Sequence, residues 1–161
     1  MISPEVRPLR TMDANRCDAI IASLPYHFGL EEGRLECAAA VRGQDGLVAV
    51  VDGLVIGFLT FVRHYDAAAE ITWMAVHAEH RRRGVGHRLL DGLCRAIASE
   101  GRRLLLVLTV SASDTGSEPE DGYQSTRSFY RSVGFVLGRD LPGYWTDDTP
   151  VLMVRPLGLA K

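Results

Sequence analysis

A short basic turn is the part of the chain whose residue types could do chemistry. Residues 81–86 read Arg-Arg-Arg-Gly-Val-Gly and stand between an apolar run and a helical apolar pattern. The first N–H groups of a helix lack intrahelical partners and lie at the positive end of its dipole. Arginines add charge there, and glycines remove side chains that would keep a ligand at a distance. The turn therefore predicts a phosphate site; a solvated basic turn is the alternative.

Two common nucleotide-binding motifs do not fit this turn. A P-loop would need Gly-Lys followed by Ser or Thr, whereas this chain has Gly86 followed by His87. A dinucleotide fingerprint would need a third glycine, and the turn contains a Gly-x-Gly pair only. The spacing therefore indicates a phosphate site of another kind.

Strands and helices alternate around the turn. Apolar β-branched runs predict strands, and apolar residues three and four apart predict helices. Asp-Gly at residues 52–53 predicts a hairpin, and the strand–helix–strand unit around the turn predicts a parallel crossover. The chain thus predicts one domain, residues 1–161, with a mixed α/β sheet and helices on both faces. Expected strands are residues 6–10, 47–51, 54–62, 69–76, 104–110, 135–137 and 151–154; expected helices are residues 13–24, 31–41, 85–97 and 126–133.

The strand before the turn also has a predicted orientation. Side chains alternate between the two faces of a strand. Alternation predicts Glu70, Thr72, Met74 and Val76 on one face, and Ile71, Trp73 and Ala75 on the other.

Composition excludes several classes of protein. The formal net charge is -2 at pH 7, whereas a duplex-binding protein usually has a strongly basic face, so no nucleic acid is expected. The three cysteines show no CxxC pair and no metal-ligand spacing, which favours free thiols in a reducing cytosol and no metal. No apolar run could cross a bilayer, and the first residues follow no signal-peptide pattern. We therefore expect a cytoplasmic protein without a membrane partner.

Two segments resemble the GNAT superfamily of N-acetyltransferases. Residues 81–86 fit the family's Gln/Arg-x-x-Gly-x-Gly/Ala pyrophosphate loop, which follows a strand and precedes a helix. Residues 125–135, Ser-Thr-Arg-Ser-Phe-Tyr-Arg-Ser-Val-Gly-Phe, look like the family's helix with Phe-Tyr followed by Gly-Phe. The resemblance covers nearly the whole chain and extends to small bacterial members of unassigned substrate. It implies a GNAT-type α/β fold with a mixed, mostly antiparallel central sheet and helices on both faces.

The resemblance also implies where acetyl-CoA would bind. The strand end would pair with the pantetheine arm through the main chain of Met74, Ala75 and Val76. The later helix would add contacts from Tyr123 and Thr126, although the family often has asparagine where this chain has Tyr123. The pyrophosphate would lie against the loop residues Arg81, Arg82, Arg83, Gly84, Val85, Gly86 and His87.

Tyr130 and Glu70 are the expected catalytic residues. The resemblance implies Tyr130 as the acid that protonates the leaving thiolate, and a phenol pKa of about 10 against a thiol pKa of about 8.5 makes this feasible. Glu70 stands where the histone-acetylating branch of the family has its general base. A base is needed because an alkyl ammonium, with a pKa of about 10.4, must lose a proton before attack. The alternatives are a core tyrosine beside Phe129 and a solvated glutamate. No Cys-His signature supports a cysteine nucleophile.

The function predicted is transfer of an acetyl group from acetyl-CoA to a primary amine by direct attack in a ternary complex. Acidic and aromatic groups suit a cationic acceptor, a small molecule or a protein amine, which would lie near residues 26–28, residues 114–121 and Tyr144-Trp145. A solvated loop is the alternative for that region. A catalytically silent acyl-CoA sensor and a basic-turn nucleic-acid binder are the alternative functions, and a homodimer is one option for the oligomeric state.

Overall fold

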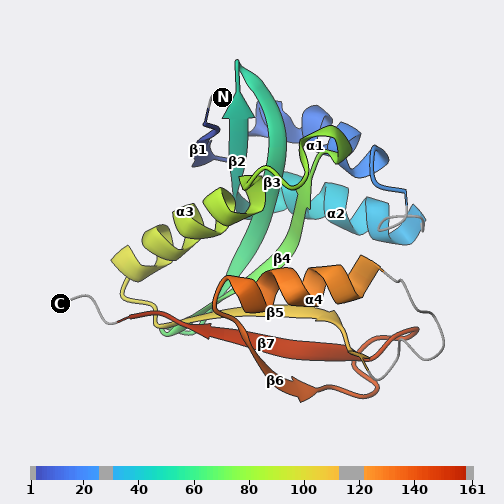
Figure 1. Cartoon of the computed structure of the whole chain (residues 1–161), viewed down its shortest axis with the longest axis vertical. Helices are drawn as coiled ribbons and strands as arrows, with labels where there is room; N and C mark the ends of the chain where they lie inside the picture. Colours follow the sequence, from blue (N-terminus) through green and yellow to red (C-terminus); the bar gives the residue numbers. More distant parts are fainter. Residues whose placement is uncertain (1–2, 26–30, 113–121, 159–161) are drawn as a thin grey trace.

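The fold is built on a seven-stranded sheet (Figure 1). The structure is a computed structural model, and it describes residues 3–25, 31–112 and 122–158. The strand order is β1-β2-β3-β4-β5-β7-β6, and every neighbouring pair is antiparallel except β4 and β5. This confirms the predicted mixed, mostly antiparallel α/β sheet. The strands are β1 (Glu5–Pro8), β2 (Asp45–Val51), β3 (Leu54–His64), β4 (Ala68–Val76), β5 (Leu104–Val110), β6 (Val136–Asp140) and β7 (Pro150–Pro156).

Helices cover both faces of the sheet, as predicted. α1 and α2 pack with Val55 and Phe58 in one buried cluster, whereas α3 and Tyr130 of α4 belong to a second cluster on the opposite face. Among the helices that the structure describes, none is long and apolar enough to cross a membrane. The helices are α1 (Ala14–Ala22), α2 (Glu31–Gly43), α3 (Val85–Ser99) and α4 (Gly122–Ser132), with 3-10 turns η1 (Thr11–Asp13) and η2 (Ala78–His80).

A local signal in the sequence accounts for the connection between β2 and β3. The predicted Asp-Gly hairpin joins β2 to β3, and both turn residues are left-handed, with φ of 50° at Asp52 and 77° at Gly53. A two-residue hairpin turn of this kind needs positive φ at both positions. Asp13 is at the N-cap position of α1, but its carboxylate does not cap that helix. It accepts hydrogen bonds from Arg7 at 2.8 and 2.9 Å instead, and these bonds lower the pKa of Asp13.

β4 and β5 are paired over a short distance only. Residues 68–71 of β4 lie beside residues 104–107 of β5 in parallel register. Beyond that point the two strands diverge, because β4 continues along β3 whereas β5 continues along β7 (Figure 1). The edge of β4 from Met74 to Val76 consequently has no described strand beside it.

A β-bulge at Thr72 coincides with the point of divergence. Thr60 lies opposite Trp73 and Phe61 lies opposite Ile71, so Thr72 is the extra residue in β4. Its Oγ1 donates to Gln44 Oε1 at 2.5 Å and lies 2.7 Å from Thr60 Oγ1. A hydroxyl carries one proton, so Thr60 must be the donor to Thr72. A side-chain cluster from three segments therefore holds the bulge.

The bulge overturns the predicted alternation of side chains in β4. Ile71 packs in the same buried cluster as Met74 and Val76, on the face covered by α3. Trp73 and Ala75 pack in the opposite cluster. The prediction that grouped Ile71 with Trp73 and Ala75 is wrong, because one extra residue reverses which face the side chains before it occupy. For the same reason Glu70, next to Ile71, lies on the opposite face from Met74 and Val76 and not on their face as predicted.

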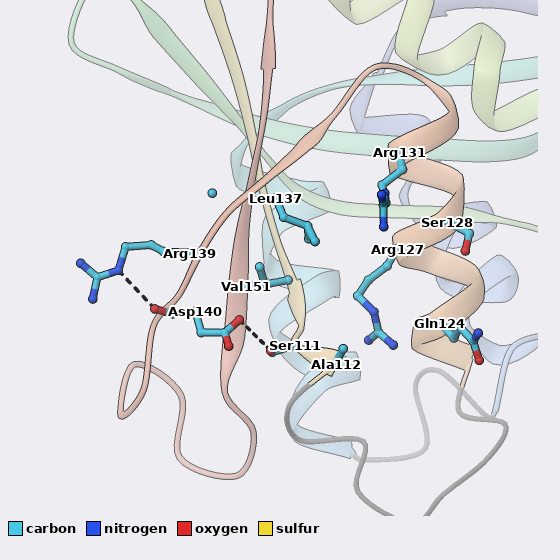
Figure 2. A pocket seen from close by; sticks show the side chains of 11 residues that line it. Ser111, Ala112, Gln124, Arg127, Ser128, Arg131, Leu137, Arg139, Asp140 and Val151 are labelled. Carbon is cyan, nitrogen blue, oxygen red and sulfur yellow. Dashed lines mark hydrogen bonds between the residues drawn. The ribbon is translucent and has the colours of Figure 1, made fainter.

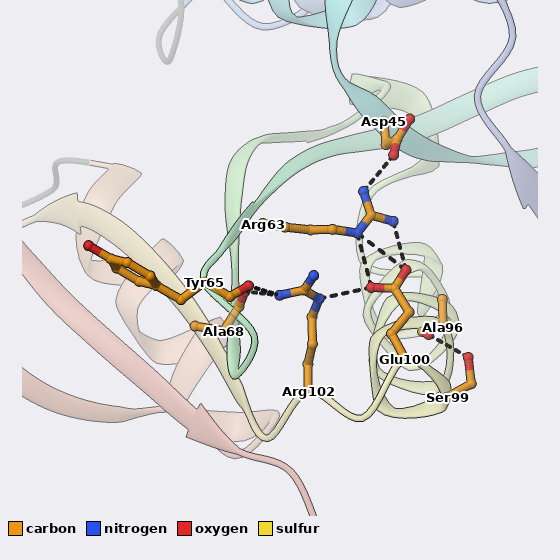
Figure 3. Close-up of polar contacts among 8 residues, drawn as sticks. All are labelled: Asp45, Arg63, Tyr65, Ala68, Ala96, Ser99, Glu100 and Arg102. Atoms are coloured by element: carbon orange, nitrogen blue, oxygen red, sulfur yellow. Dashed lines mark hydrogen bonds and ion pairs between the residues drawn. The ribbon is translucent and has the colours of Figure 1, made fainter.

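A charged network lies at the other end of β4, where it is paired with β5. Arg63 donates to Glu100 at 2.7 Å and to Asp45 at 2.6 Å. Arg102 donates to Glu100 at 2.8 Å and to the carbonyl oxygen of Tyr65 at 2.7 Å (Figure 3). These contacts join β2, the β3–β4 turn and the end of α3.

Candidate active site

The turn between β4 and α3 presents a run of backbone N–H groups without acceptors. Arg88 N–H donates to Gly84 O at 3.1 Å and is the first amide of α3 with an intrahelical bond. In the part of the chain that the structure describes, the N–H groups of residues 81–87 donate no hydrogen bond. The side chains of Arg81, Arg82 and Arg83 are exposed. An anion could therefore accept hydrogen bonds from these N–H groups.

Backbone conformation shapes this turn. Arg82 and Gly84 are left-handed, with φ of 63° and 79°, and Arg83 between them is not. Alternation of right- and left-handed residues turns successive N–H groups toward one concavity, which is the geometry of an anion nest. A Cβ placed on Gly84 would meet no atom within 4 Å, so the space beside the turn is open. Conformation and open space both favour an anion here.

Gly86 is the point at which β4, α3 and α4 meet. A Cβ on Gly86 would lie 3.0 Å from Met74 Cε and 3.0 Å from Phe129 Cζ. The His87 ring also contacts Phe129, with ring centroids 5.2 Å apart. The glycine therefore permits close packing of the two sequence motifs, a role that its place in the turn did not indicate. Residues 81–87 and the Phe129-Tyr130 helix are brought together as a result.

The unpaired edge of β4 begins beside this junction. His77 N–H donates to Ile56 O of β3 at 2.9 Å. Successive N–H groups of an extended strand point to opposite sides, so the Val76 N–H points away from β3 and toward the divergence from β5. Met74, two residues earlier, presents its main chain to the same side. The resemblance named Met74, Ala75 and Val76 for contacts with the pantetheine arm. Met74 and Val76 present main-chain groups to the open side, whereas the main chain of Ala75 faces β3 opposite Phe58.

Tyr130 lies inside the core, in the buried cluster that also includes Ile71 of β4 and Val107 of β5. It is 6% exposed, and its ring packs against Phe129 and Phe135 with centroids 5.4 and 5.2 Å apart. Among the described residues its hydroxyl has no hydrogen-bond partner, although buried polar groups almost always have one. Burial raises the pKa of Tyr130 above its ordinary value of 10. The phenol is therefore protonated at physiological pH and able to donate.

Two further predicted contact residues lie on the same helix. Tyr123 and Thr126 are half-buried in the first part of α4, and each has an interaction partner of its own. Arg127, on the next position, donates from Nη1 to Val110 O at 2.6 Å and fixes α4 to the end of β5.

Glu70 lies on β4 one residue before parallel pairing ends. Its Oε1 is 2.7 Å from His64 Nε2, and its side chain is 24% exposed. The imidazole is a partner that the sequence did not reveal, because it comes from the neighbouring strand. The arrangement could pass a proton from Glu70 to solvent through His64.

The cysteines offer no nucleophile. Cys17, Cys37 and Cys94 are free thiols. Burial raises the pKa of Cys17 and of Cys37 to about 12, and it raises the pKa of Cys94. The thiolate is the reactive form, so these groups are unsuited to covalent catalysis.

The expected acceptor region is only partly described. Tyr26, His27, Phe28 and residues 114–121 lie outside the described residues. Tyr144 and Trp145, between β6 and β7, are 65% and 36% exposed. The acceptor site in this region stays a prediction.

The sequence matches one family model, which is described as an acetyltransferase (GNAT) domain. The match covers residues 42–137, more than half of the chain. It includes both the basic turn and the Phe129-Tyr130 helix. No curated protein matches the chain.

Solved structures share the fold at low sequence identity. A GNAT-family protein from Desulfovibrio desulfuricans has a TM-score of 0.81 and 19% identity, over 97% of this chain and all of that one. The ribosomal-protein-S18-alanine N-acetyltransferase from Escherichia coli has a TM-score of 0.74 and 18% identity, over 98% of this chain and 96% of that one. An aminoglycoside 6'-N-acetyltransferase in complex with coenzyme A has a TM-score of 0.72 and 15% identity, over 100% and 99%.

The likeness to these structures extends over the whole fold, and the family model spans the elements that form the candidate site. The chain belongs to the GNAT family of acetyltransferases and is an acyltransferase.

Proposed function

We propose that the protein transfers an acetyl group from acetyl-CoA to a primary amine. The observation that carries this proposal is the run of unbonded N–H groups at residues 81–87, which lies next to the unpaired edge of β4. An oxyanion suits the first feature, and an extended amide-containing chain suits the second. Acetyl-CoA has both groups in one molecule.

The donor fits these elements in one order. Its pyrophosphate would accept hydrogen bonds from the N–H groups of residues 81–87, with Arg81, Arg82 and Arg83 adding charge. Its pantetheine arm would lie along Met74, Ala75 and Val76, and the thioester would reach the divergence near Tyr130. Tyr123 and Thr126 would flank it from α4.

The reaction would then be a direct attack. The amine nitrogen forms a bond to the thioester carbon, and negative charge grows on the carbonyl oxygen, where the Val76 N–H can donate. The carbon–sulfur bond breaks, and the sulfur accepts a proton from the Tyr130 hydroxyl. Glu70 accepts the proton that the ammonium loses before attack and passes it to solvent. The nitrogen loses its second proton to solvent as the amide forms, and one proton from solvent restores Tyr130. In sum, acetyl-CoA and an ammonium give an amide, CoA thiol and one proton.

The raised pKa of Tyr130 bears on the acid step. A phenol that is less acidic than usual transfers its proton to a thiolate, of pKa about 8.5, less readily. Donation of a strong hydrogen bond to the sulfur as the bond breaks needs no complete transfer, and burial strengthens such a bond. Tyr130 would therefore act chiefly by stabilising the leaving sulfur.

Replacement of Gly84 by aspartate and by asparagine tests where the donor binds. Both side chains make the same demand on a backbone with φ of 79°, and both have room. Only aspartate puts an anion beside the pyrophosphate, where like charges about 4 Å apart repel by about 4 kcal/mol near a protein surface. We expect Gly84→Asp to weaken acetyl-CoA binding at least about 100-fold by calorimetry, and Gly84→Asn to weaken it far less.

Equal affinities of a folded Gly84→Asp variant and the Gly84→Asn control would contradict the assignment. Thiol release from acetyl-CoA across a panel of polyamines, amino acids, aminoglycosides and peptides then tests the reaction. Donor binding without turnover on any of these amines would favour the sensor alternative. Cytoplasmic location and a single domain over residues 1–161 stay predictions.

A further inference from the structure

A pocket of about 730 Å³ opens between α4 and β6 (Figure 2). Pockets of roughly 300–1,000 Å³ are the usual size of small-molecule sites. The α4 residues that line it include Arg127, Ser128 and Arg131. Tyr130 and Phe129 lie on the opposite side of α4, so the pocket is separate from the candidate active site.

The α4 wall of this pocket is cationic. Figure 2 shows the side chains of Arg127 and Arg131 directed from α4 into the pocket. One N–H group of Arg127 donates to Val110 O, and the others are available to a ligand. Arg131 is exposed and, among the described residues, has no acidic partner. Like charges four residues apart on a helix destabilise it by about 0.2–0.5 kcal/mol, and no acidic side chain of the described residues offsets this cost at Arg131.

The opposite wall is apolar because of a β-bulge at Gly138. Leu137 pairs with Met153 and Arg139 pairs with Leu152, which leaves Gly138 as the extra residue. A Cβ there would lie 2.9 Å from Leu152 O, so the bulge accepts only glycine without rearrangement.

The bulge decides which side chains of β6 face the pocket. Leu137 points toward α4, whereas the Arg139 guanidinium points away (Figure 2). Leu137 is 51% exposed and, with Val151 of β7, forms the apolar surface. Asp140 turns back toward Ser111, whose Oγ donates to it at 2.6 Å.

We propose that this pocket binds a small organic acid. Its oxyanionic group, a carboxylate or a phosphate, would lie between Arg127 and Arg131, since a guanidinium binds either one through paired N–H groups. Its apolar body would lie on Leu137 and Val151. The inference does not depend on the proposed acetyl transfer, because no residue of this pocket belongs to the donor site.

Titration of isotope-labelled protein with three probes tests the proposal. Phenylacetate and phenylphosphate supply the two oxyanions on the same body, and phenylacetamide is the uncharged control. We expect saturable shifts in the backbone amide signals of Ser128, Leu137 and Gly138 with at least one acid and none with the amide. The acid that binds distinguishes a carboxylate ligand from a phosphate ligand. Gly84 and Gly86 signals report separately on the anion-binding turn.

Variants of Arg127 and Arg131 test whether these side chains bind the acid. Arg131→Gln and Arg127→Gln should each weaken the acid at least about fivefold, whereas Arg95→Gln, which removes an exposed arginine from α3, should leave it unchanged. Arg131→Lys should keep part of the affinity. Shifts confined to residues 81–87, equal binding of phenylacetamide, or undiminished binding by Arg131→Gln would each overturn the proposal.

Discussion

At the residue scale, Tyr130 combines a ring that is part of the core with a hydroxyl that has no described partner. A tyrosine kept only for packing could be a phenylalanine, because burial of an unsatisfied hydroxyl costs about 1–3 kcal/mol. The hydroxyl is therefore better explained by a bound partner, such as the sulfur of the donor, than by the stability of the free protein.

Replacement of Tyr130 by phenylalanine separates these two roles. We expect kcat to fall by about 10²–10⁴, the usual contribution of a positioned proton donor, with little change in KM for acetyl-CoA. The free energy of unfolding should be unchanged or higher, because an unsatisfied hydroxyl is removed. Tyr65→Phe is the control, since Tyr65 is 98% exposed. Unchanged turnover of Tyr130→Phe would remove its role as acid.

Glu70 and His64 form the other residue-scale test. A base must be deprotonated to act, so the rate should decline as pH falls through the pKa of the base. We expect Glu70→Gln to lower kcat and to abolish that acid limb in the pH–rate profile. His64→Gln should retain the limb, because it removes the hydrogen bond at 2.7 Å but leaves the Glu70 carboxylate in place. A profile of Glu70→Gln that matches the wild type would exclude Glu70 as the base.

At the element scale, the important feature is the coincidence of three events in β4. The bulge at Thr72, the end of pairing with β5 and the start of the free edge all fall between Ile71 and Met74. Thr60 and Gln44 hold the bulge through side chains, and Thr60 is fully buried. These hydrogen bonds therefore set where the free edge begins.

Replacement of Thr72 by valine tests this role. Valine keeps the shape but leaves Gln44 and Thr60 without their partner, which should lower the free energy of unfolding by about 1–3 kcal/mol. We also expect a raised KM for acetyl-CoA with a smaller change in kcat, because the edge would shift. Ile20→Val, in the buried cluster of α1, should cost about 0.5–1.5 kcal/mol without a change in KM. If KM for acetyl-CoA is the same in both variants, Thr72 stabilises the fold but does not position the free edge of β4.

The sequence predicted the elements well because their signals are local. Periodicity identified the strands and helices, and the basic turn stood where the structure has it, between β4 and α3. The bulges at Thr72 and Gly138 could not be predicted, since each depends on the register of a neighbouring strand. The His64 partner of Glu70 and the pocket beside Arg131 were missed for the same reason: strands and helices distant in sequence bring those groups together.

At the scale of the whole molecule, apolar packing holds the helices on both faces of the sheet. A charged network connects segments at the end of the sheet where β4 pairs with β5. Arg63 and Arg102 both donate to Glu100, and Arg63 also reaches Asp45 (Figure 3). Hydrogen bonds from Arg63, and then from Arg102, lower the pKa of Glu100 from 4.5 to about 2. The network thus contributes to global stability in a pH-dependent way.

The sign of that dependence follows from the lowered pKa. The ionised carboxylate favours the folded state, so its contribution is fully present above about pH 4.5 and is lost as pH falls toward 2. We expect Glu100→Gln to lower the free energy of unfolding by about 1 kcal/mol at pH 7, since the pairs are partly exposed. The difference from wild type should shrink below pH 4.5 in urea titrations. Glu36→Gln, an exposed residue of α2, should show no such difference.

The brief contact between β4 and β5 has a mechanical consequence. In the described chain, strands β1–β4 and strands β5–β7 are paired with each other only through residues 68–71 and 104–107. The sheet therefore has two parts that are joined by one short paired stretch. A molecule that lies along the free edge of β4 would connect the two parts of the sheet while it is bound. Binding of the donor would then also reduce the motion of the two parts relative to each other. This would be visible as slower amide hydrogen exchange in both parts at once.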